Sequence, residues 1–257
     1  MNSDKSKQKI SVLTFCHNQE KNIENHLKQL SFADEIIVID QNSTDRSVDI
    51  AAKNGAFVLK LENNAKIAQE KLAVFKAKND WILLTDCTYQ FSNLLTDEIL
   101  DKISSANNRT QFYTKETLFF FGKKIKYGDI YTKKKLLIFN KERYNDSNNS
   151  SLCDQDDTSK TSIVLKNRID SYAYNSFDEY NTNLGFLRKT EAQVLFNKKI
   201  KPNFYHFLFK PFFVFVNQYF IKLGFIDGKE GCILASINAF SILKRYLILW
   251  LLYRDMD

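Results

Sequence analysis

The N-terminal third of the chain alternates short apolar runs with longer segments in which apolar residues recur at helical spacing. Residues 36–39 form an unbroken run of β-branched side chains, which is typical of a strand buried on both faces of a sheet. Ile23, Leu27 and Leu30 are spaced to lie on one face of a helix. Because strands and crossover helices alternate, the pattern predicts an α/β fold with a mainly parallel sheet. The predicted strands cover residues 10–15, 36–39, 56–61 and 81–86.

Polar side chains stand at the carboxyl ends of three of these strands. Asp40 follows the second strand, Asp86 closes the fourth, and the polar residues 16–20 follow the first. The carboxyl ends of parallel strands meet at one edge, where open α/β sheets bind ligands, so we expect these groups to converge. An aspartate there can accept hydrogen bonds from a nucleotide, although Asp40 or Asp45 could instead cap the helix that follows. For Asp45 we favour the cap.

The composition limits the class of protein. With 257 residues, 44% hydrophobic and 26% charged, the chain is globular and long enough for one large domain or a domain with an appendage. The four cysteines are scattered, which favours a reducing compartment over a disulfide framework. The lysine-rich N-terminus lacks the apolar core of a signal peptide. A net charge of +7 suits anionic partners, namely nucleotide phosphates, nucleic acid or an anionic membrane face.

Three stretches of sequence carry a resemblance to a known family. Residues 33–46 read Ala-Asp-Glu-Ile-Ile-Val-Ile-Asp-Gln-Asn-Ser-Thr-Asp-Arg. Residues 119–129 read Phe-Phe-Phe-Gly-Lys-Lys-Ile-Lys-Tyr-Gly-Asp, and residues 224–231 read Gly-Phe-Ile-Asp-Gly-Lys-Glu-Gly. With these motifs, nearly the whole chain resembles the family 2 inverting glycosyltransferases, and within them the branch that adds sugars to the lipopolysaccharide core of bacteria.

This resemblance implies a fold and a division of the chain. The implied fold is GT-A, a Rossmann-like α/β arrangement with a mainly parallel sheet flanked by helices. Residues 1–200 are expected to form this glycosyltransferase domain, and residues 201–257 an appendage of aromatic-rich, amphipathic helices.

The resemblance also implies a site for a nucleotide-diphosphate sugar. In the family, the aspartate at the position of Asp40 contacts the base of the donor. An Asp-x-Asp motif after the fourth strand holds the ribose and a divalent metal, Mg²⁺ or Mn²⁺, that bridges the diphosphate. Here the motif reads Asp86-Cys87-Thr88, so Asp86 is the expected metal ligand and the second carboxylate is absent. The other positions expected to bind the donor are Cys16, Asn18 and Gln69.

The catalytic base implied by the resemblance falls in the polar segment 144–162. Inverting transfer needs a carboxylate that removes the proton of the acceptor hydroxyl as this hydroxyl attacks the anomeric carbon. Counting back from Leu165 places Asp154 at the family's position for the base. The neighbouring Asp156 and Asp157 could serve equally well, and the alternative is that all three are solvated acids of a loop.

Two apolar runs near the C-terminus, residues 204–220 and 232–253, mix aromatic and aliphatic residues with lysine and arginine. Neither reaches the ~20 uninterrupted apolar residues of a membrane span, whereas both suit helices lying on a bilayer surface. Packing on the globular domain or a dimer contact is the competing interpretation. We therefore expect a cytoplasmic protein, peripheral at the inner face of the membrane.

A second basic feature is the lysine run 133–135, whose members could meet phosphates or form a solvated face. Because base-stacking aromatic residues do not cluster with the lysines, nucleic acid is not an expected partner.

These observations favour a transferase that moves a sugar from a nucleotide-diphosphate donor to a lipid-linked saccharide, in the lipopolysaccharide core or a related glycolipid. The altered Asp-x-Asp motif leaves a second hypothesis, a catalytically degenerate protein that keeps the fold as a binding or assembly partner. A third, nucleotidyl transfer, predicts the release of pyrophosphate instead of a nucleoside diphosphate.

Overall fold

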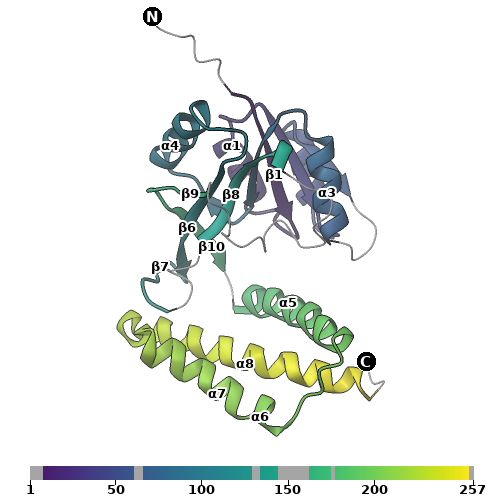
Figure 1. The fold of residues 1–257 in the computed structure, drawn as a ribbon, viewed down its shortest axis with the longest axis vertical. Helices are drawn as coiled ribbons and strands as arrows, with labels where there is room; N and C mark the ends of the chain where they lie inside the picture. Colours follow the sequence, from purple (N-terminus) through teal and green to yellow (C-terminus); the bar gives the residue numbers. More distant parts are fainter. Residues whose placement is uncertain (1–7, 61–65, 129–133, 144–161, 175–176, 255–257) are drawn as a thin grey trace, which may run out of the picture. The chain divides into compact units, whose positions relative to one another are not determined.

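The structure is a computed structural model that describes residues 8–60, 66–128, 134–143, 162–174 and 177–254 (Figure 1). The chain forms two compact units, each made of two segments. The first unit combines Met1–Glu116 with Lys134–Ser171, and the second combines Thr117–Lys133 with Tyr172–Asp257. From the sequence, residues 1–200 were expected to form the glycosyltransferase domain. The second unit includes some of these residues, namely Thr117–Lys133 and the part of Tyr172–Asp257 before residue 201. The division at residue 200 stays a prediction.

The strands predicted for the first unit are present, and they pair in parallel. β1 lies between β2 and β4, and β3 pairs with the outer side of β2. The strands are β1 (Ile10–Cys16), β2 (Glu35–Asp40), β3 (Phe57–Lys60) and β4 (Trp81–Asp86). The helices that follow the first three of them are α1 (Ile23–Gln29), α2 (Ser47–Lys53) and α3 (Lys66–Lys76). The α/β class expected from the sequence is confirmed.

Beyond β4 the sheet becomes mixed. β8 is antiparallel to both β4 and β6, whereas the short β9 runs parallel to β6. β10 and β5 form a further antiparallel pair at the end of the strand order. These elements are β5 (Tyr89–Gln90), β6 (Gln111–Phe120), β8 (Lys134–Asn140), β9 (Ser162–Val164) and β10 (Ile169–Tyr174), with helix α4 (Asn93–Ser104) between β5 and β6. The mainly parallel arrangement therefore describes the N-terminal part of the sheet.

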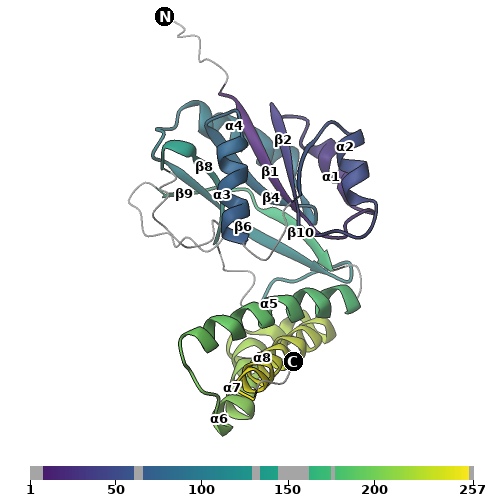
Figure 2. The same cartoon turned by 90° about the vertical axis from the view of Figure 1, so that its right-hand side faces the viewer.

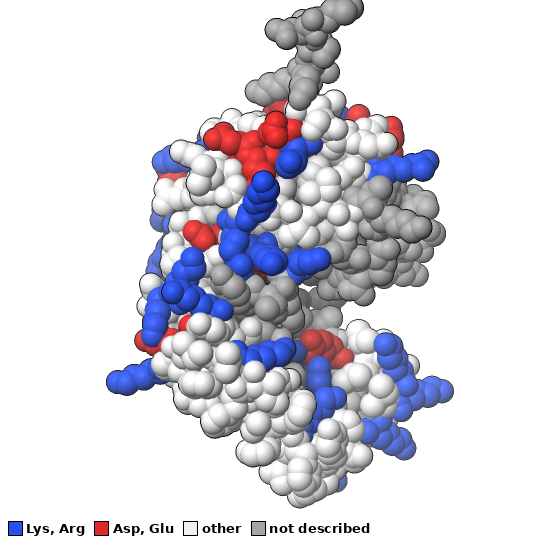
Figure 3. Space-filling view, turned by 60° about the vertical axis from the view of Figure 1, so that its left-hand side comes forward, with Lys and Arg blue, Asp and Glu red and all other residues white. Residues whose placement is uncertain are grey.

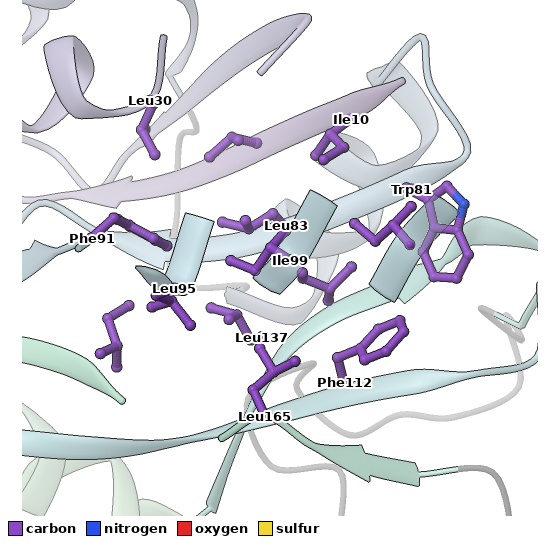
Figure 4. Close-up of a cluster of buried hydrophobic side chains, with 14 residues drawn as sticks. Ile10, Leu30, Trp81, Leu83, Phe91, Leu95, Ile99, Phe112, Leu137 and Leu165 are labelled. Atoms are coloured by element: carbon purple, nitrogen blue, oxygen red, sulfur yellow. The ribbon is translucent and has the colours of Figure 1, made fainter. Parts of the chain in front are cut away.

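Helices cover both faces of the parallel strands, which explains their unbroken apolar runs (Figure 2). Leu83 of β4 packs against Ile99 of α4 in one buried cluster (Figure 4). Leu13 of β1 points to the opposite face and packs in a second cluster with Ala73 of α3. Successive strand residues point to opposite faces. A strand buried on both sides therefore needs apolar residues at every position.

The second unit is mainly helical. Ala192 of α5, together with Tyr246 and Leu249 of α8, forms one of its cores. Leu118, Phe120, Ile125 and Leu234 form another. The helices are α5 (Phe177–Asn197), α6 (Phe204–Phe207), α7 (Phe209–Val216) and α8 (Lys229–Leu252), with a short hairpin strand β7 (Lys123–Lys124) paired to β6. A π-helical turn at Asn217–Ile221 and a 3₁₀ turn at Gly224–Asp227 join α7 to α8.

α8 is long and apolar enough to cross a membrane. The core helix of a soluble protein can have the same length and composition. From the sequence, a membrane span was not expected here because polar residues interrupt the apolar run. In the structure α8 packs against α5 within the second unit. Arg245 of α8 donates to Glu191 of α5 at 3.0 Å, and Glu191 also accepts from Arg188 at 2.6 Å. The guanidinium group of Arg245 is therefore paired within the helical unit.

Candidate functional site

The strand register brings Asp40 and Asp86 to the same edge of the sheet. Cys16 pairs with Asp40 across β1 and β2, and Phe15 pairs with Asp86 across β1 and β4. Neighbouring strands lie about 4.8 Å apart, so the two aspartate backbones stand roughly 10 Å apart, one on each side of β1. The predicted convergence of these residues is confirmed, while their roles in binding stay predictions.

The loops after β1 and β2 are joined by hydrogen bonds at this edge. The side-chain oxygen of Asn18 accepts from the backbone N–H of Thr44 at 2.8 Å, and the N–H of Asn18 donates to Ser43 Oγ at 3.0 Å. The N–H of Gln19 donates to Ser47 Oγ at 2.7 Å. Asn18 is exposed and has a left-handed backbone, with φ of 50°. The side-chain oxygen of Asn18 therefore helps to join the two loops, while the residue itself stays exposed to solvent.

Asp45 binds the N-terminus of α2, close to the capping role that the sequence favoured, although the N-cap position itself is Arg46. Asp45 Oδ1 accepts from the N–H of Ser47, the first residue of α2, at 3.0 Å, and from Ser47 Oγ at 2.5 Å. Its Oδ2 accepts from the N–H of Glu20 at 3.0 Å. Desolvation alone would raise the pKa of Asp45, but these hydrogen bonds lower it. The charged form of Asp45 thus stabilises the α2 N-terminus and ties it to the loop after β1.

The carboxylate of Asp40 closes the turn after β2. Both of its oxygens lie within hydrogen-bond distance of the backbone N–H of Ser43, at 3.2 and 3.3 Å, and the residue is 3% exposed. A carboxylate has about four acceptor positions, so this contact leaves capacity for another donor group. In the structure Asp40 holds the turn, and its contact with a nucleotide base remains a prediction.

The residue that replaces the second carboxylate of Asp-x-Asp bonds to the first. Asp86 Oδ1 accepts from the N–H of Thr88 at 2.9 Å and from its hydroxyl at 2.8 Å. Asp86 is half-buried, so part of it remains open to solvent. Thr88 therefore orients the carboxylate of Asp86 instead of adding a second negative charge beside it.

The described side chains at this edge do not by themselves make a metal site. Over the described ranges of the chain, no group of three or more His, Cys, Asp or Glu side chains is placed to hold a metal ion. Magnesium takes near-octahedral oxygen coordination, and Asp86 offers one carboxylate already bonded to Thr88. A metal at this edge would need most of its ligands from a bound substrate and water.

Cys16 and Cys87 lie beneath the edge as a contacting pair of thiols. They are 1% and 4% exposed, and the Cys87 thiol donates to the carbonyl oxygen of Phe15 at 3.5 Å. The hydrogen bond to Cys16, reinforced by burial, raises the pKa of Cys87 well above its usual value. With its side chain buried, Cys16 lies in the core that supports the edge, and its contact with a donor stays a prediction.

Two further predicted positions are Gln69, for the donor, and Asp154, for the base. Gln69 lies in α3, which follows β3, and the structure describes its backbone. Asp154 lies outside the described residues, as do Asp156 and Asp157. The structure therefore places the donor-side predictions Cys16, Asn18, Asp40 and Asp86 together and does not address the base.

A cluster of three side chains that includes Tyr89, just after β4, was not predicted from the sequence. Lys135 of β8 contacts the carboxylate of Glu116 on β6, and its ammonium donates to the hydroxyl of Tyr89 at 2.5 Å. Burial raises the pKa of Tyr89, so the phenol stays protonated. The available sequence signal was a run of lysines, which does not reveal that one of them faces two partners on other strands.

The fold and this edge define a class of protein, the α/β proteins with carboxylates at the ends of parallel strands. Comparisons with known proteins indicate which members of this class the chain is similar to. The family model described as Glycosyl transferase family 2 matches residues 11–107, the segment that holds Asp40 and Asp86. An uncharacterized glycosyltransferase of Rickettsia bellii is 26% identical over 246 residues, covering 91% of this chain and 83% of that protein. One of Rickettsia conorii is 24% identical over 250 residues, covering 91% and 87%. The segment that holds Asp40 and Asp86 is thus similar to the family 2 glycosyltransferases, and most of the chain is similar to these two proteins.

Similarity to solved structures covers less of the chain. Glucosyl-3-phosphoglycerate synthase from Mycobacterium tuberculosis, in complex with Mn²⁺, UDP and glucosyl-3-phosphoglycerate, is 19% identical with a TM-score of 0.37. The match spans 44% of this chain and 45% of that one, less than half of either. The same enzyme with Mg²⁺ and UDP gives 20% identity and a TM-score of 0.39.

Proposed function

We propose that this protein transfers a sugar, with inversion, from a nucleotide-diphosphate sugar to a lipid-linked saccharide such as the lipopolysaccharide core. The observation that carries the proposal is the pairing of Asp40 and Asp86 to neighbouring residues of β1. Both lie in the segment that matches the glycosyltransferase model. Two carboxylates separated along one edge suit a nucleotide, whose base and ribose both present hydrogen-bond donors.

Each residue at the edge has a proposed role. Asp40 would accept from the base, Asp86 from the ribose hydroxyls, and Asn18, Gln69 and Cys16 would contact the remainder of the donor. Asp154 would take the proton of the acceptor hydroxyl while the oxygen of that hydroxyl forms a bond to the anomeric carbon. The bond from that carbon to the diphosphate then breaks, and its electron pair leaves with the nucleoside diphosphate.

A divalent cation, Mg²⁺ or Mn²⁺, is part of this proposal with Asp86 as its protein ligand. When bound, such an ion would offset the negative charge of the diphosphate. Because the described residues supply few ligands, its binding should depend on the donor being present. Donor binding should therefore be measured with and without each metal.

The test is a titration with UDP-, GDP- and ADP-sugars, scored by thermal shift, followed by product analysis with the donor that binds. Ligands that bind the folded state stabilise it by RT ln(1 + [L]/Kd), so a true donor raises the melting temperature in a concentration-dependent way. We expect a nucleoside diphosphate as product. Pyrophosphate would instead indicate nucleotidyl transfer. Binding without turnover in the presence of an acceptor would favour a catalytically degenerate partner protein.

The acceptor side of the proposal rests on an apolar surface of the second unit. Side chains of α6 and α7 that would be expected in a core are exposed, with Phe204 at 72%, Phe212 at 66% and Phe213 at 56%. Ile221 and Phe225 continue the exposed series into the turns before α8. Figure 3 shows a broad surface of this unit without charged side chains, with basic residues beside it. An apolar surface bordered by lysine and arginine suits the interface of an anionic membrane, where a lipid-linked acceptor lies.

We expect Phe212→Gln combined with Phe213→Gln to reduce binding to anionic vesicles by about tenfold or more, because full burial of a Phe side chain contributes about 1.5–3 kcal/mol. The measurement is co-flotation with vesicles of phosphatidylethanolamine and phosphatidylglycerol. The control is Phe57→Gln with Phe75→Gln, which removes two exposed rings of the first unit. Wild-type protein that stays off the vesicles, or that elutes as a dimer which the double substitution dissociates, would overturn the membrane assignment.

A further inference from the structure

Lys135 stands at the start of β8 with its ammonium group fixed by two partners. It pairs with the carboxylate of Glu116 and donates to the hydroxyl of Tyr89 at 2.5 Å. The same ammonium lies 5.0 Å from the centre of the Tyr89 ring. The side chain of Glu116 is 9% exposed, whereas that of Lys135 is 46% exposed. The ammonium therefore caps a buried carboxylate and presents its other side to solvent.

Tyr89 links this lysine to Asp86. β8 runs antiparallel to β4, and their paired residues end at Leu83 and Ile138, before Asp86 and Lys135 are reached. Burial is the main cause that raises the pKa of Tyr89, and the charges of Lys135 and Asp86 both act on the same phenol. Lys135 and Asp86 thus both lie near Tyr89, within the first unit.

An ammonium group held in this way is suited to a phosphate ligand. It has three N–H donors, and among the described residues Glu116 and Tyr89 take two of them, which leaves one donor and the exposed side for a ligand. Burial alone would lower the pKa of Lys135, but Tyr89 and Glu116 raise it above its usual range. The charge is therefore permanent at neutral pH, and little side-chain freedom is lost when a ligand binds.

We propose that Lys135 binds the diphosphate of the donor and stabilises the charge that develops on the departing nucleoside diphosphate. This inference rests on the proposed transferase function and assigns a positively charged group to its donor site. Thr88 stands where a second carboxylate would help to hold a cation, and the described residues contain no cluster of three metal-ligand side chains. Lys135, a fixed cation that shares Tyr89 with Asp86, supplies positive charge where fewer protein ligands hold a metal.

The step balances without any other reactant. As the acceptor oxygen bonds to the anomeric carbon, the bond from that carbon to the diphosphate oxygen breaks, and the electron pair stays on that oxygen. Lys135 remains protonated throughout and donates a hydrogen bond to the diphosphate. Hydrogen bonds between charged groups are roughly twice as strong as neutral ones, and preorganised donors make the largest contributions where charge develops.

The competing interpretation is that Lys135 only neutralises Glu116 inside the sheet, since buried ion pairs often serve packing alone. Binding measurements separate the two, because a structural lysine does not distinguish a nucleoside from its diphosphate. The variants are Lys135→Met and Lys135→Arg. Lys134→Met is the matched control, because it removes the same charge from the adjacent, exposed residue of the same strand.

The affinity of each variant is measured for UDP, GDP or ADP, whichever wild type binds most tightly, and for the corresponding nucleoside. We expect Lys135→Met to weaken diphosphate binding by about tenfold to a hundredfold, as for loss of a hydrogen bond to a charged group. Nucleoside binding should be unchanged. Lys134→Met should bind both as wild type does, and Lys135→Arg should retain part of the diphosphate affinity.

If Lys135→Met binds the diphosphate as wild type does, the role of Lys135 is wrong and the transferase proposal is unaffected. If wild type binds no nucleoside diphosphate, both proposals fail. Lys135→Met could unfold because Glu116 is left as an unpaired buried charge. In that case the double variant Glu116→Gln with Lys135→Met removes both charges. A folded double variant with wild-type diphosphate affinity would also overturn the role of Lys135.

Discussion

Asp86→Asn should lower the rate of sugar transfer by about 10²- to 10³-fold, the range seen when one preorganised polar group is removed from an active site. Asparagine keeps the shape of aspartate, and its side-chain oxygen can still accept from the N–H and hydroxyl of Thr88. The loop after β4 should therefore keep its conformation. What is lost is the negative charge at the carboxyl end of β4, which the ribose and any metal would use.

The measurement is the release of nucleoside diphosphate at saturating donor and acceptor. Asp49→Asn is the matched control, since it removes one carboxylate from an exposed position of α2 and should leave the rate unchanged. Equal melting temperatures for the two variants would show that the fold is intact. Transfer at the wild-type rate by Asp86→Asn would mean that the proposed donor site is in the wrong place.

The edge that carries Asp86 could be anticipated because its physical signal is local. The unbroken apolar run at residues 36–39 indicates a strand buried on both faces, and the polar residue that follows marks where the strand leaves the core. The same logic applies at Asp86. Since parallel strands share one carboxyl edge, two local patterns were enough to predict that Asp40 and Asp86 lie at the same edge of the sheet. The strand order, which puts them on either side of β1, came from the structure.

The antiparallel part of the site could not be anticipated in this way. Lys135, Glu116 and Tyr89 come from three strands whose pairing depends on long connections, and no local periodicity sets that pairing. In sequence Lys135 belongs to a basic run, but adjacent strand residues point to opposite faces, so its environment differs from that of Lys134. The bond from Thr88 to Asp86 was also unforeseen, because a substitution in a motif does not reveal a new hydrogen bond.

The segment Gly-Phe-Ile-Asp-Gly-Lys-Glu-Gly, which carried part of the resemblance, has a structural role in the second unit. The carboxylate of Asp227 is 5% exposed and accepts from the backbone N–H groups of Lys126 and Tyr127. The ammonium of Lys123 donates to the carbonyl of Asp227 and to the carboxylate of Glu230, each at 2.7 Å. The buried acidic residue of this motif therefore accepts from two backbone donors, and it fixes the β7 hairpin to the N-terminus of α8.

Replacing a glycine of the same segment should have a large effect on the free energy of unfolding. Gly231→Ala should destabilise the second unit by about 3 kcal/mol or more, the upper range for overpacking a buried site. A β-carbon at Gly231 would lie 2.0 Å from the carbonyl oxygen of Gly224 and 3.0 Å from its carbon. Both of these are backbone atoms, so the clash cannot be relieved by a change of side-chain rotamer. The first turn of α8 would have to move away from the 3₁₀ turn at Gly224–Asp227.

The measurement is thermal unfolding followed by circular dichroism, in which Gly231→Ala should melt at least about 10 °C below wild type. Gly185→Ala in α5 is the matched control. Its added methyl would meet only the end of the Lys244 side chain, at 2.9 Å from the nitrogen, and that chain can move aside. Alanine is favoured over glycine inside a helix by about 0.5–1 kcal/mol, so the control should melt at or above the wild-type temperature. A Gly231→Ala protein as stable as the control would contradict the close approach of α8 to this turn.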